Sequence, residues 1–215
     1  MKQKSKGHLH RWFIRFGLLL IAAALLLTAC NLYDAARADR SVHKLTERLQ
    51  AFLAAQYDDT GRDHAGGRLP DELEIPDYML DPDMEMPQEI IDGQAYIGLL
   101  RIPALSLELP VISRWSDSRL RIAPCRYSGS AYTKDMIIAG HNYDSHFGRL
   151  KNLSAGDEIS FTDMTDNLFR YEVAEMEILQ PDAVEEMQTG DWDLTLFTCT
   201  LGGRTRVVIR CARII

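Results

Sequence analysis

Residues 194–210 read L-T-L-F-T-C-T-L-G-G-R-T-R-V-V-I-R. The five residues before Cys199 are apolar, aromatic or β-branched, which predicts a strand that is buried on both faces and ends at the thiol. Gly202 and Gly203 predict a short turn, and the Val-Val-Ile run at 207–209 predicts a second strand, so the two strands form a hairpin. Cys199 is therefore expected at the end of a strand, beside a loop.

Three arginines follow this cysteine, at positions 204, 206 and 210. A nearby cation favours the thiolate, which is the nucleophilic form of a cysteine. A structural cysteine in a β-core is the alternative for Cys199, but the arginines and the loop favour a nucleophile. Arg206 opens the second strand, so its side chain can point back over the thiol, whereas Arg210 lies a further strand length away. We therefore predict Arg206 as the partner of Cys199, with Arg204 as the alternative.

A short apolar strand at 136–139 runs into a Gly-His-Asn sequence. A histidine just past a strand end lies where loops carry function, and imidazole takes or gives a proton near neutral pH. Taken alone, His141 is more often interpreted as a structural residue than as a catalytic one. Together with Cys199 and Arg206, it completes a nucleophile, an acid/base and an electrophilic stabiliser, which is the minimum set for acyl transfer.

The second half of the chain has a β pattern throughout. Apolar runs bounded by turn residues predict strands at 95–102, 105–111, 136–139, 158–162, 168–178, 194–199 and 206–211. Seven or eight strands in about 120 residues, with few helices, predict a mainly β domain over 90–215 that closes into a β-barrel.

Residues 1–30 combine a basic flank with an apolar run at 16–29. A basic flank before an apolar segment keeps the flank in the cytoplasm and places the following chain outside. Three interpretations remain open: an uncleaved membrane anchor, a lipoprotein signal in which Cys30 of Leu-Thr-Ala-Cys is lipidated, and a cleaved signal peptide. The anchor is favoured because a helical pattern follows Cys30 without a spacer. All three interpretations export the chain.

Two segments lie between the anchor and the barrel. Residues 31–57 repeat apolar side chains at three- and four-residue steps, which predicts a membrane-proximal helix, either a stalk or a helix packed on the domain. Residues 58–89 are rich in Pro, Gly and acids, which predicts a linker. The end of the linker, 70–88, is a candidate lid over a substrate groove, although a plain linker is favoured.

Composition argues against several classes of partner and site. The net charge of −7 and the lack of a long basic run after the first residues argue against nucleic acid as the main partner. The four cysteines contain no CxxC pair, so neither a zinc ribbon nor a thioredoxin motif is indicated. Cys125 and Cys211 could pair across the fold, but we expect both to be free because a domain of this size has its own core.

Six segments of the chain jointly resemble the sortase family. They are T-L-F-T-C at 195–199, I-I-A-G-H-N at 137–142, Y-I-G-L-L-R-I-P at 96–103, L-E-L-P-V at 107–111, A-P-C-R-Y-S-G-S at 123–130 and L-S-A-G-D-E-I-S-F at 153–161. Arg206 follows Cys199 by seven residues (206 minus 199). The resemblance covers about residues 90–215, and the basic flank, the anchor and the following helix are similar to the family's usual front end.

The resemblance implies an eight-stranded sortase-type β-barrel and a cysteine transpeptidase on the outer face of a Gram-positive cell membrane, held by a single-pass anchor. Cys199 would attack the Thr–Gly carbonyl of an LPxTG-like sorting signal on a surface protein. His141 would protonate the departing amine and then help to activate the incoming amine of a cell-wall precursor or a pilin lysine. Arg206 would hold the substrate and stabilise the oxyanion. The neighbours Thr198 and Asn142 are the expected substrate contacts.

The subclass is inferred from departures within the resemblance. Asp81-Pro82 is similar to the lid of pilin-assembling class C sortases, but Asp83 stands where that lid carries an aromatic residue, and no membrane segment follows Ile215 in the sequence. We therefore expect a class D- or B-like role. No acidic calcium site of the class A kind is present in the sequence, so we expect neither a metal nor a cofactor.

Three rival hypotheses use the same residues. A cysteine peptidase would hydrolyse the acyl intermediate with water in place of the amine. An exported β-barrel binding module would carry Cys199 as an inert thiol. A metal site would combine His141, His146 and Cys199, but the sequence offers no obvious fourth ligand.

Overall fold

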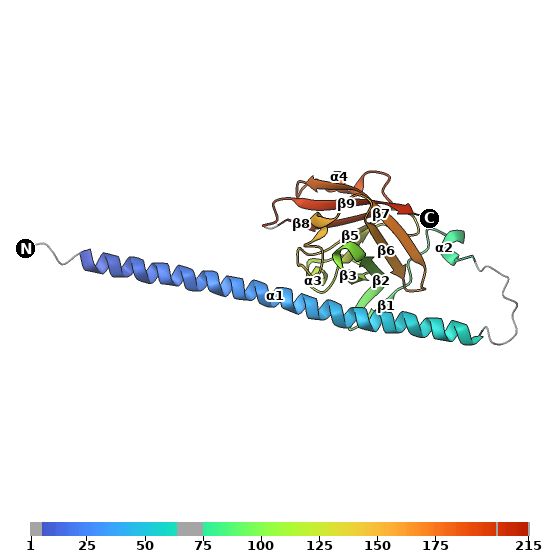
Figure 1. Ribbon diagram of the computed structural model, residues 1–215, viewed down its shortest axis with the longest axis horizontal. Coiled ribbons are helices and arrows are strands. Elements are labelled where there is room, and N and C mark those ends of the chain that lie inside the picture. The colour runs from blue at the N-terminus through green and yellow to red at the C-terminus, as the bar shows by residue number, and fades with distance from the viewer. Residues whose placement is uncertain (1–5, 64–74, 201, 215) are drawn as a thin grey trace, which may run out of the picture. The chain divides into compact units, whose positions relative to one another are not determined.

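The computed structural model describes residues 6–63, 75–200 and 202–214. The chain forms two compact units, Met1–Arg37 and Ala38–Ile215, and helix α1 (Lys6–Asp63) begins in the first and ends in the second (Figure 1). The helix end predicted at residue 57 is corrected to Asp63, because neither Gly nor Pro occurs within 18–60 to end the helix earlier.

The part of α1 in the first unit is apolar and exposed. Within Arg11–Ala55, an 18-residue window reaches a mean hydropathy of 2.3, and none of that window is buried. A span of this length and composition is sufficient to cross a membrane. Within the described residues, this helix is therefore a candidate membrane anchor.

The part of α1 in the second unit packs against the barrel. Ala38, Val42, Leu45 and Leu49 are buried at the three- and four-residue spacing that defines one face of a helix. The Thr46 hydroxyl donates a hydrogen bond to the main-chain oxygen of a barrel strand, over 3.1 Å. Of the two alternatives for this helix, the structure has the packed helix and not a free stalk.

Nine strands form one sheet within the described residues. They are β1 (Glu89–Ile91), β2 (Gln94–Ile102), β3 (Leu107–Ile112), β4 (Cys125–Ser128), β5 (Met136–Ala139), β6 (Glu158–Asp163), β7 (Leu168–Leu179), β8 (Leu194–Cys199) and β9 (Arg206–Ile214). Their order is β1-β2-β3-β4-β5-β8-β9-β7-β6, and β6 also pairs with β2. That last pairing closes β2 to β6 into a ring of eight strands, to which β1 is added as a hairpin. The predicted eight-stranded closed barrel is confirmed.

Short helices fill the connections: α2 (Asp77–Leu80), η1 (Pro103–Leu105), α3 (Asp117–Leu120), η2 (Leu150–Asn152) and α4 (Val184–Gln188). The barrel interior is filled by alternate strand residues, among which Phe161, Phe169 and Tyr171 are fully buried. A second cluster lies on the outer face of β5, β8 and β9 and includes Phe197, Val208 and Met187 of α4. Cys125 and Cys211 are buried and form no disulfide, as predicted, and Cys30 and Cys199 are exposed and form none either.

Strand β9 connects two distinct ends of the barrel. It pairs with β7 from Arg206 opposite Leu179 to Ile214 opposite Arg170, so the two ends are about 26 Å apart at the rise of an extended strand. Figure 1 shows the turn between β8 and β9 on one side of the domain and the C-terminus beside α2 on the other.

The described part of the predicted linker lies at the Ile214 end. Tyr78 stacks on Tyr132 with ring centroids 4.8 Å apart and meets Phe169 edge-on at 5.3 Å, while Met86 is buried. Tyr78 therefore packs at the Ile214 end of β9, and the choice between a plain linker and a lid stays a prediction. Residues 70–74 of that candidate lid lie outside the described residues.

Candidate active site

Cys199 is the last residue of β8, and its side chain is exposed. Across the β8–β9 hairpin it lies directly opposite Arg206. Residues directly opposite each other in an antiparallel pair have their side chains on the same face. The side chains of Cys199 and Arg206 therefore leave the backbone at neighbouring positions on the outer face of the barrel.

Thr198 points the other way. Because successive strand residues face opposite sides of a sheet, the residue before Cys199 faces the interior. The Thr198 side chain is 2% exposed, and its hydroxyl has no hydrogen-bond partner among the described residues. The prediction that the side chain of Thr198 contacts substrate is therefore wrong.

His141 comes from the strand next to β8. Strands β5 and β8 are parallel, with Ala139 beside Phe197, and the main-chain N–H of Gly140 extends the pairing by donating to the Phe197 oxygen over 3.0 Å. His141 is two residues beyond Ala139, as Cys199 is two residues beyond Phe197. The two side chains thus leave adjacent strand ends. Asn142 follows in the loop and is half-buried.

The imidazole of His141 is held in a ring stack. It lies on the Tyr143 ring at a centroid distance of 4.5 Å, and Tyr143 in turn meets His146 edge-on at 5.4 Å. Burial, together with the nearby charge of Arg121, lowers the pKa of His141 below its ordinary value, and Asp117 acts in the opposite direction. His141 is therefore uncharged at neutral pH in the free protein and can accept a proton.

His146 is a buried structural residue. Its side chain is fully buried, and neither ring nitrogen has a hydrogen-bond partner among the described residues. Burial and the neighbouring His141 lower the pKa of His146 to about 4, so that it is neutral at physiological pH. The described residues contain no group of three His, Cys, Asp or Glu side chains that could hold a metal ion, which argues against the metal-site hypothesis.

Arg206 is half-buried and lies beside apolar groups. Its guanidinium carbon is 5.6 Å from the centre of the Phe197 ring, and its Nη1 is 3.9 Å from the sulfur of Met187. None of the ion pairs among the described residues involves Arg206.

Arg204, the alternative partner, lies in the turn between β8 and β9. Thr200 and Thr205 close this turn through a main-chain hydrogen bond of 2.8 Å and a hydroxyl contact of 3.0 Å. Arg204 is exposed between them and outside the strand ladder. The geometry therefore favours Arg206 as the residue that faces the thiol.

Helix α4 forms a wall of the site that sequence reasoning missed. The five-residue helix places fully buried Met187 against Phe197 and beside Arg206. A run of Val-Glu-Glu-Met-Gln is too short to show helical periodicity, so the sequence carried no signal for the wall.

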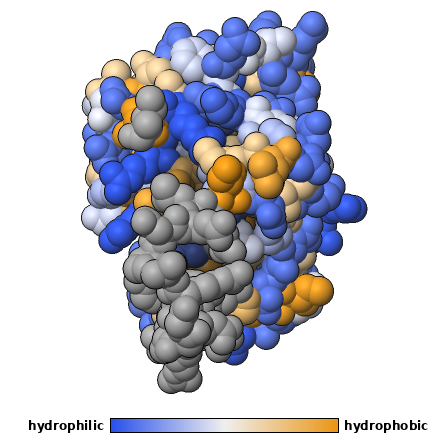
Figure 2. Space-filling model, turned by 90° about the vertical axis from the view of Figure 1, so that its right-hand side faces the viewer, coloured by the Kyte–Doolittle hydropathy of each residue, from blue (hydrophilic) through white to orange (hydrophobic). Residues whose placement is uncertain are grey.

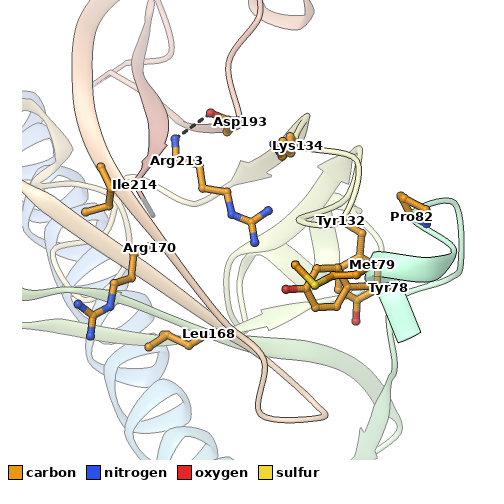
Figure 3. A pocket seen from close by; sticks show the side chains of 10 residues that line it. All are labelled: Tyr78, Met79, Pro82, Tyr132, Lys134, Leu168, Arg170, Asp193, Arg213 and Ile214. Carbon is orange, nitrogen blue, oxygen red and sulfur yellow. Dashed lines mark hydrogen bonds between the residues drawn. The ribbon is translucent and has the colours of Figure 1, made fainter. Parts of the chain in front are cut away.

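A pocket of about 780 Å³ lies at the other end of the barrel and does not include the candidate catalytic side chains. It is lined by Tyr78, Met79, Pro82, Tyr132, Lys134, Leu168, Arg170, Asp193, Arg213 and Ile214 (Figure 3). Figure 2 views this side of the domain, where apolar side chains gather on a largely hydrophilic surface, and Met79, Leu80 and Leu168 are exposed.

Comparison with known proteins gives concordant results. Residues 100–214 match the family model described as the sortase domain. Sortase A of Bacillus anthracis is 27% identical over 195 residues, which cover 85% of this chain and 84% of the relative.

Solved structures share the fold. Sortase C1 of Streptococcus agalactiae matches with a TM-score of 0.53 at 20% identity, over 82% of this chain and 98% of that one. Sortase C of Streptococcus pneumoniae gives 0.52 at 20% identity, over 81% and 96%. A Clostridium perfringens sortase D5 transpeptidase gives 0.50 at 24% identity, over 59% and 83%.

Proposed function

Because the chain belongs to the sortase family, whose members are cysteine transpeptidases, we propose that it cleaves an LPxTG-like sorting signal between Thr and Gly and transfers the acyl part to an amine. The observation that carries this proposal is the register of the hairpin. It sets an exposed Cys199 directly opposite Arg206, with His141 at the end of the adjacent strand.

The first half-reaction forms a thioester. Neutral His141 accepts the proton of the Cys199 thiol as the sulfur attacks the carbonyl carbon of the Thr residue. When the tetrahedral intermediate collapses, the C–N bond breaks and His141 gives the proton to the departing Gly amine. The lowered pKa of His141, caused mainly by burial, supports its role as the base in the resting protein.

The second half-reaction reverses these roles. An incoming amine attacks the thioester carbon, His141 takes a proton from the attacking nitrogen, and the sulfur leaves as the thiol after receiving that proton. Arg206 donates hydrogen bonds to the oxygen that becomes negative in both tetrahedral intermediates. Its position beside Phe197, away from any carboxylate partner among the described residues, supports this role.

The cellular setting follows from the apolar helix. We propose that α1 anchors the chain once through the membrane and leaves the barrel on the outer surface of a Gram-positive cell. The partners would be surface proteins that bear a C-terminal sorting signal, and the acceptor would be a peptidoglycan-precursor amine or a pilin lysine. A class D- or B-like role and the absence of a metal or cofactor remain predictions, as does the contact between substrate and Asn142.

The test uses the full chain in detergent with a panel of fluorogenic LPxTG-like peptides, with and without triglycine. Mass spectrometry should find the peptide's N-terminal part ligated to triglycine, and prior alkylation of Cys199 should abolish the product. Cleavage without ligation would favour a cysteine peptidase. No cleavage, with Cys199 resistant to alkylation, would favour the binding module with an inert thiol.

A further inference from the structure

Arg210 is a buried charge that the reaction as described does not use. It lies on the same face of β9 as Arg206 and is opposite Thr195 of β8, with its side chain only 3% exposed. Burying a guanidinium group is costly unless its donors are satisfied. The buried guanidinium group of Arg210 is therefore expected to have a specific structural or functional role.

Arg210 joins helix α4 to two neighbouring strands. Nη1 donates to the Met187 main-chain oxygen and Nη2 to the Glu186 oxygen, each over 2.7 Å. These are carbonyls at the C-terminal end of α4, beyond which the helix supplies no further main-chain donors, and the Glu186 oxygen also accepts the Thr189 hydroxyl over 3.3 Å. Nε donates to the Glu177 carboxylate at 2.8 Å, and Nη1 also reaches the Thr195 hydroxyl at 3.2 Å. Arg210 of β9, which also bonds to Glu177 of β7 and Thr195 of β8, thus holds the C-terminal end of α4.

The end of α4 that Arg210 holds also contacts the candidate active site. The backbone that Arg210 holds carries the Met187 side chain, which packs against Phe197 and Val208 and contacts Arg206. Phe197 is also the ring beside the Arg206 guanidinium. Arg206 therefore rests on two apolar groups, and Arg210 fixes the place of one of them.

We propose that Arg210 is a positioning residue that fixes the guanidinium group of Arg206 through helix α4. It touches no reacting atom. Its effect on turnover rests on the proposed transpeptidase function, whereas its effects on α4 and on the side chain of Arg206 do not.

The decisive variant is Arg210→Lys, because lysine keeps the charge but cannot reach both carbonyls, the carboxylate and the hydroxyl together. Arg213→Lys is the matched control, since Arg213 is on the same strand and makes none of these contacts. Glu177→Gln is a milder second variant, because Glu177 is one-third exposed and glutamine still accepts a hydrogen bond. It keeps the proposal testable if Arg210→Lys fails to fold.

Three readouts on the full chain in detergent are compared. Hydrogen exchange should become about tenfold faster in Arg210→Lys at the amides of Met187 and Thr189, which bond within α4. The Nε–Hε resonance of Arg206, assigned by its loss in Arg206→Lys, should shift. With an LPxTG-like peptide, kcat should fall about tenfold to a hundredfold while KM changes little, since a displaced Arg206 weakens transition-state stabilisation. Arg213→Lys should match the wild type in all three, and Glu177→Gln should lie between.

The outcomes separate the two proposals. Unchanged hydrogen exchange in α4 of Arg210→Lys would overturn the positioning role. Faster exchange together with an unshifted Arg206 resonance would overturn it too, and would leave Arg210 as a purely structural residue. An active wild type whose kcat is unaffected by Arg210→Lys would overturn it as well. A wild type without Cys199-dependent turnover would refute the proposed function, and the exchange and resonance measurements would still decide the role of Arg210.

Discussion

The two ends of β9 carry similar residues in opposite settings. At the Arg206 end, an arginine without a carboxylate partner among the described residues lies directly opposite an exposed cysteine in the hairpin. At the Ile214 end, Arg213 lies over the Phe169 ring at 4.6 Å and borders the pocket of about 780 Å³, whose lining includes neither cysteine nor histidine. The candidate active site is thus marked by the register of reactive side chains and not by the volume of a hollow.

The strongest test of this comparison removes the thiol. We expect Cys199→Ala to lower transpeptidation by about a thousandfold or more, because no other group can form the acyl intermediate. The fold should be retained, since Cys199 is an exposed strand-end residue. Residual ligation at a substantial rate in the purified variant would refute its assignment as the nucleophile.

Labelling provides the control for that variant. Burial raises the pKa of both Cys125 and Cys211 to about 12, so both remain protonated and enclosed. Iodoacetamide applied to the native protein should therefore modify Cys199 and spare these two. Loss of activity that tracks modification of Cys125 instead would point to a different site.

The next largest effect separates the arginines. Arg206→Ala should lower kcat about a hundredfold to a thousandfold, as expected when an oxyanion donor is removed. Arg213→Ala, at the other end of the same strand, should leave kcat within about twofold, and so should Arg204→Ala in the turn. A larger loss from Arg204→Ala than from Arg206→Ala would show that the wrong arginine had been chosen.

A stability effect should appear at the Cys199 end as pH falls. Burial holds the pKa of His146 at about 4 in the folded chain, whereas the pKa is about 6.5 in the unfolded chain. Between pH 6.5 and pH 4, the unfolded state therefore binds a proton at this residue that the folded state does not bind. The free energy of unfolding therefore decreases from pH 6.5 towards pH 4, by about 3 kcal/mol from this residue. Urea unfolding at pH 7 and pH 4.5 should show a smaller pH difference in His146→Leu than in the wild type. An equal difference in both proteins would contradict this prediction.

The opposite end should respond in stability alone. Tyr78→Ala removes the stack on Tyr132 and the edge contact with Phe169, which should cost about 1–2 kcal/mol of unfolding free energy. Because these rings lie at the Ile214 end of the barrel, and β9 spans about 26 Å from that end to Arg206, kcat should be unchanged. Thermal unfolding and peptide turnover on the same preparation test both halves. A fall in kcat would mean that the two ends of the barrel are coupled.

The difference between local and distant contacts explains how much of the fold and of the candidate site the sequence could predict. The hairpin and its reactive residues are local: strand residues, two glycines and a spacing of seven place Cys199 opposite Arg206 without any knowledge of the rest of the fold. The inward orientation of Thr198 is equally local, since strand alternation places the residue before Cys199 on the opposite face of the sheet.

Other features depend on contacts between distant residues. The hydrogen bonds from Arg210 to the carbonyls of Glu186 and Met187 join residues more than twenty positions apart, and no short pattern encodes them. The packing of Tyr78 on Tyr132 is similarly distant in sequence, which is why the sequence of 75–88 leaves a lid open beside the favoured linker. In both cases the outcome is decided by which surface the barrel offers once it has closed.

The smallest expected effect concerns Cys30, on the exposed apolar part of α1. If this helix anchors the chain uncleaved, Cys30→Ser should leave membrane association and apparent mass unchanged, because the affinity comes from the apolar span and not from a lipid on the thiol. Fractionation of cells that express either form, followed by intact-mass measurement, provides the comparison. Release into the medium or a change in processing in Cys30→Ser would establish a lipoprotein instead. The barrel would then be tethered by acyl chains, and the register of its active hairpin would be unaffected.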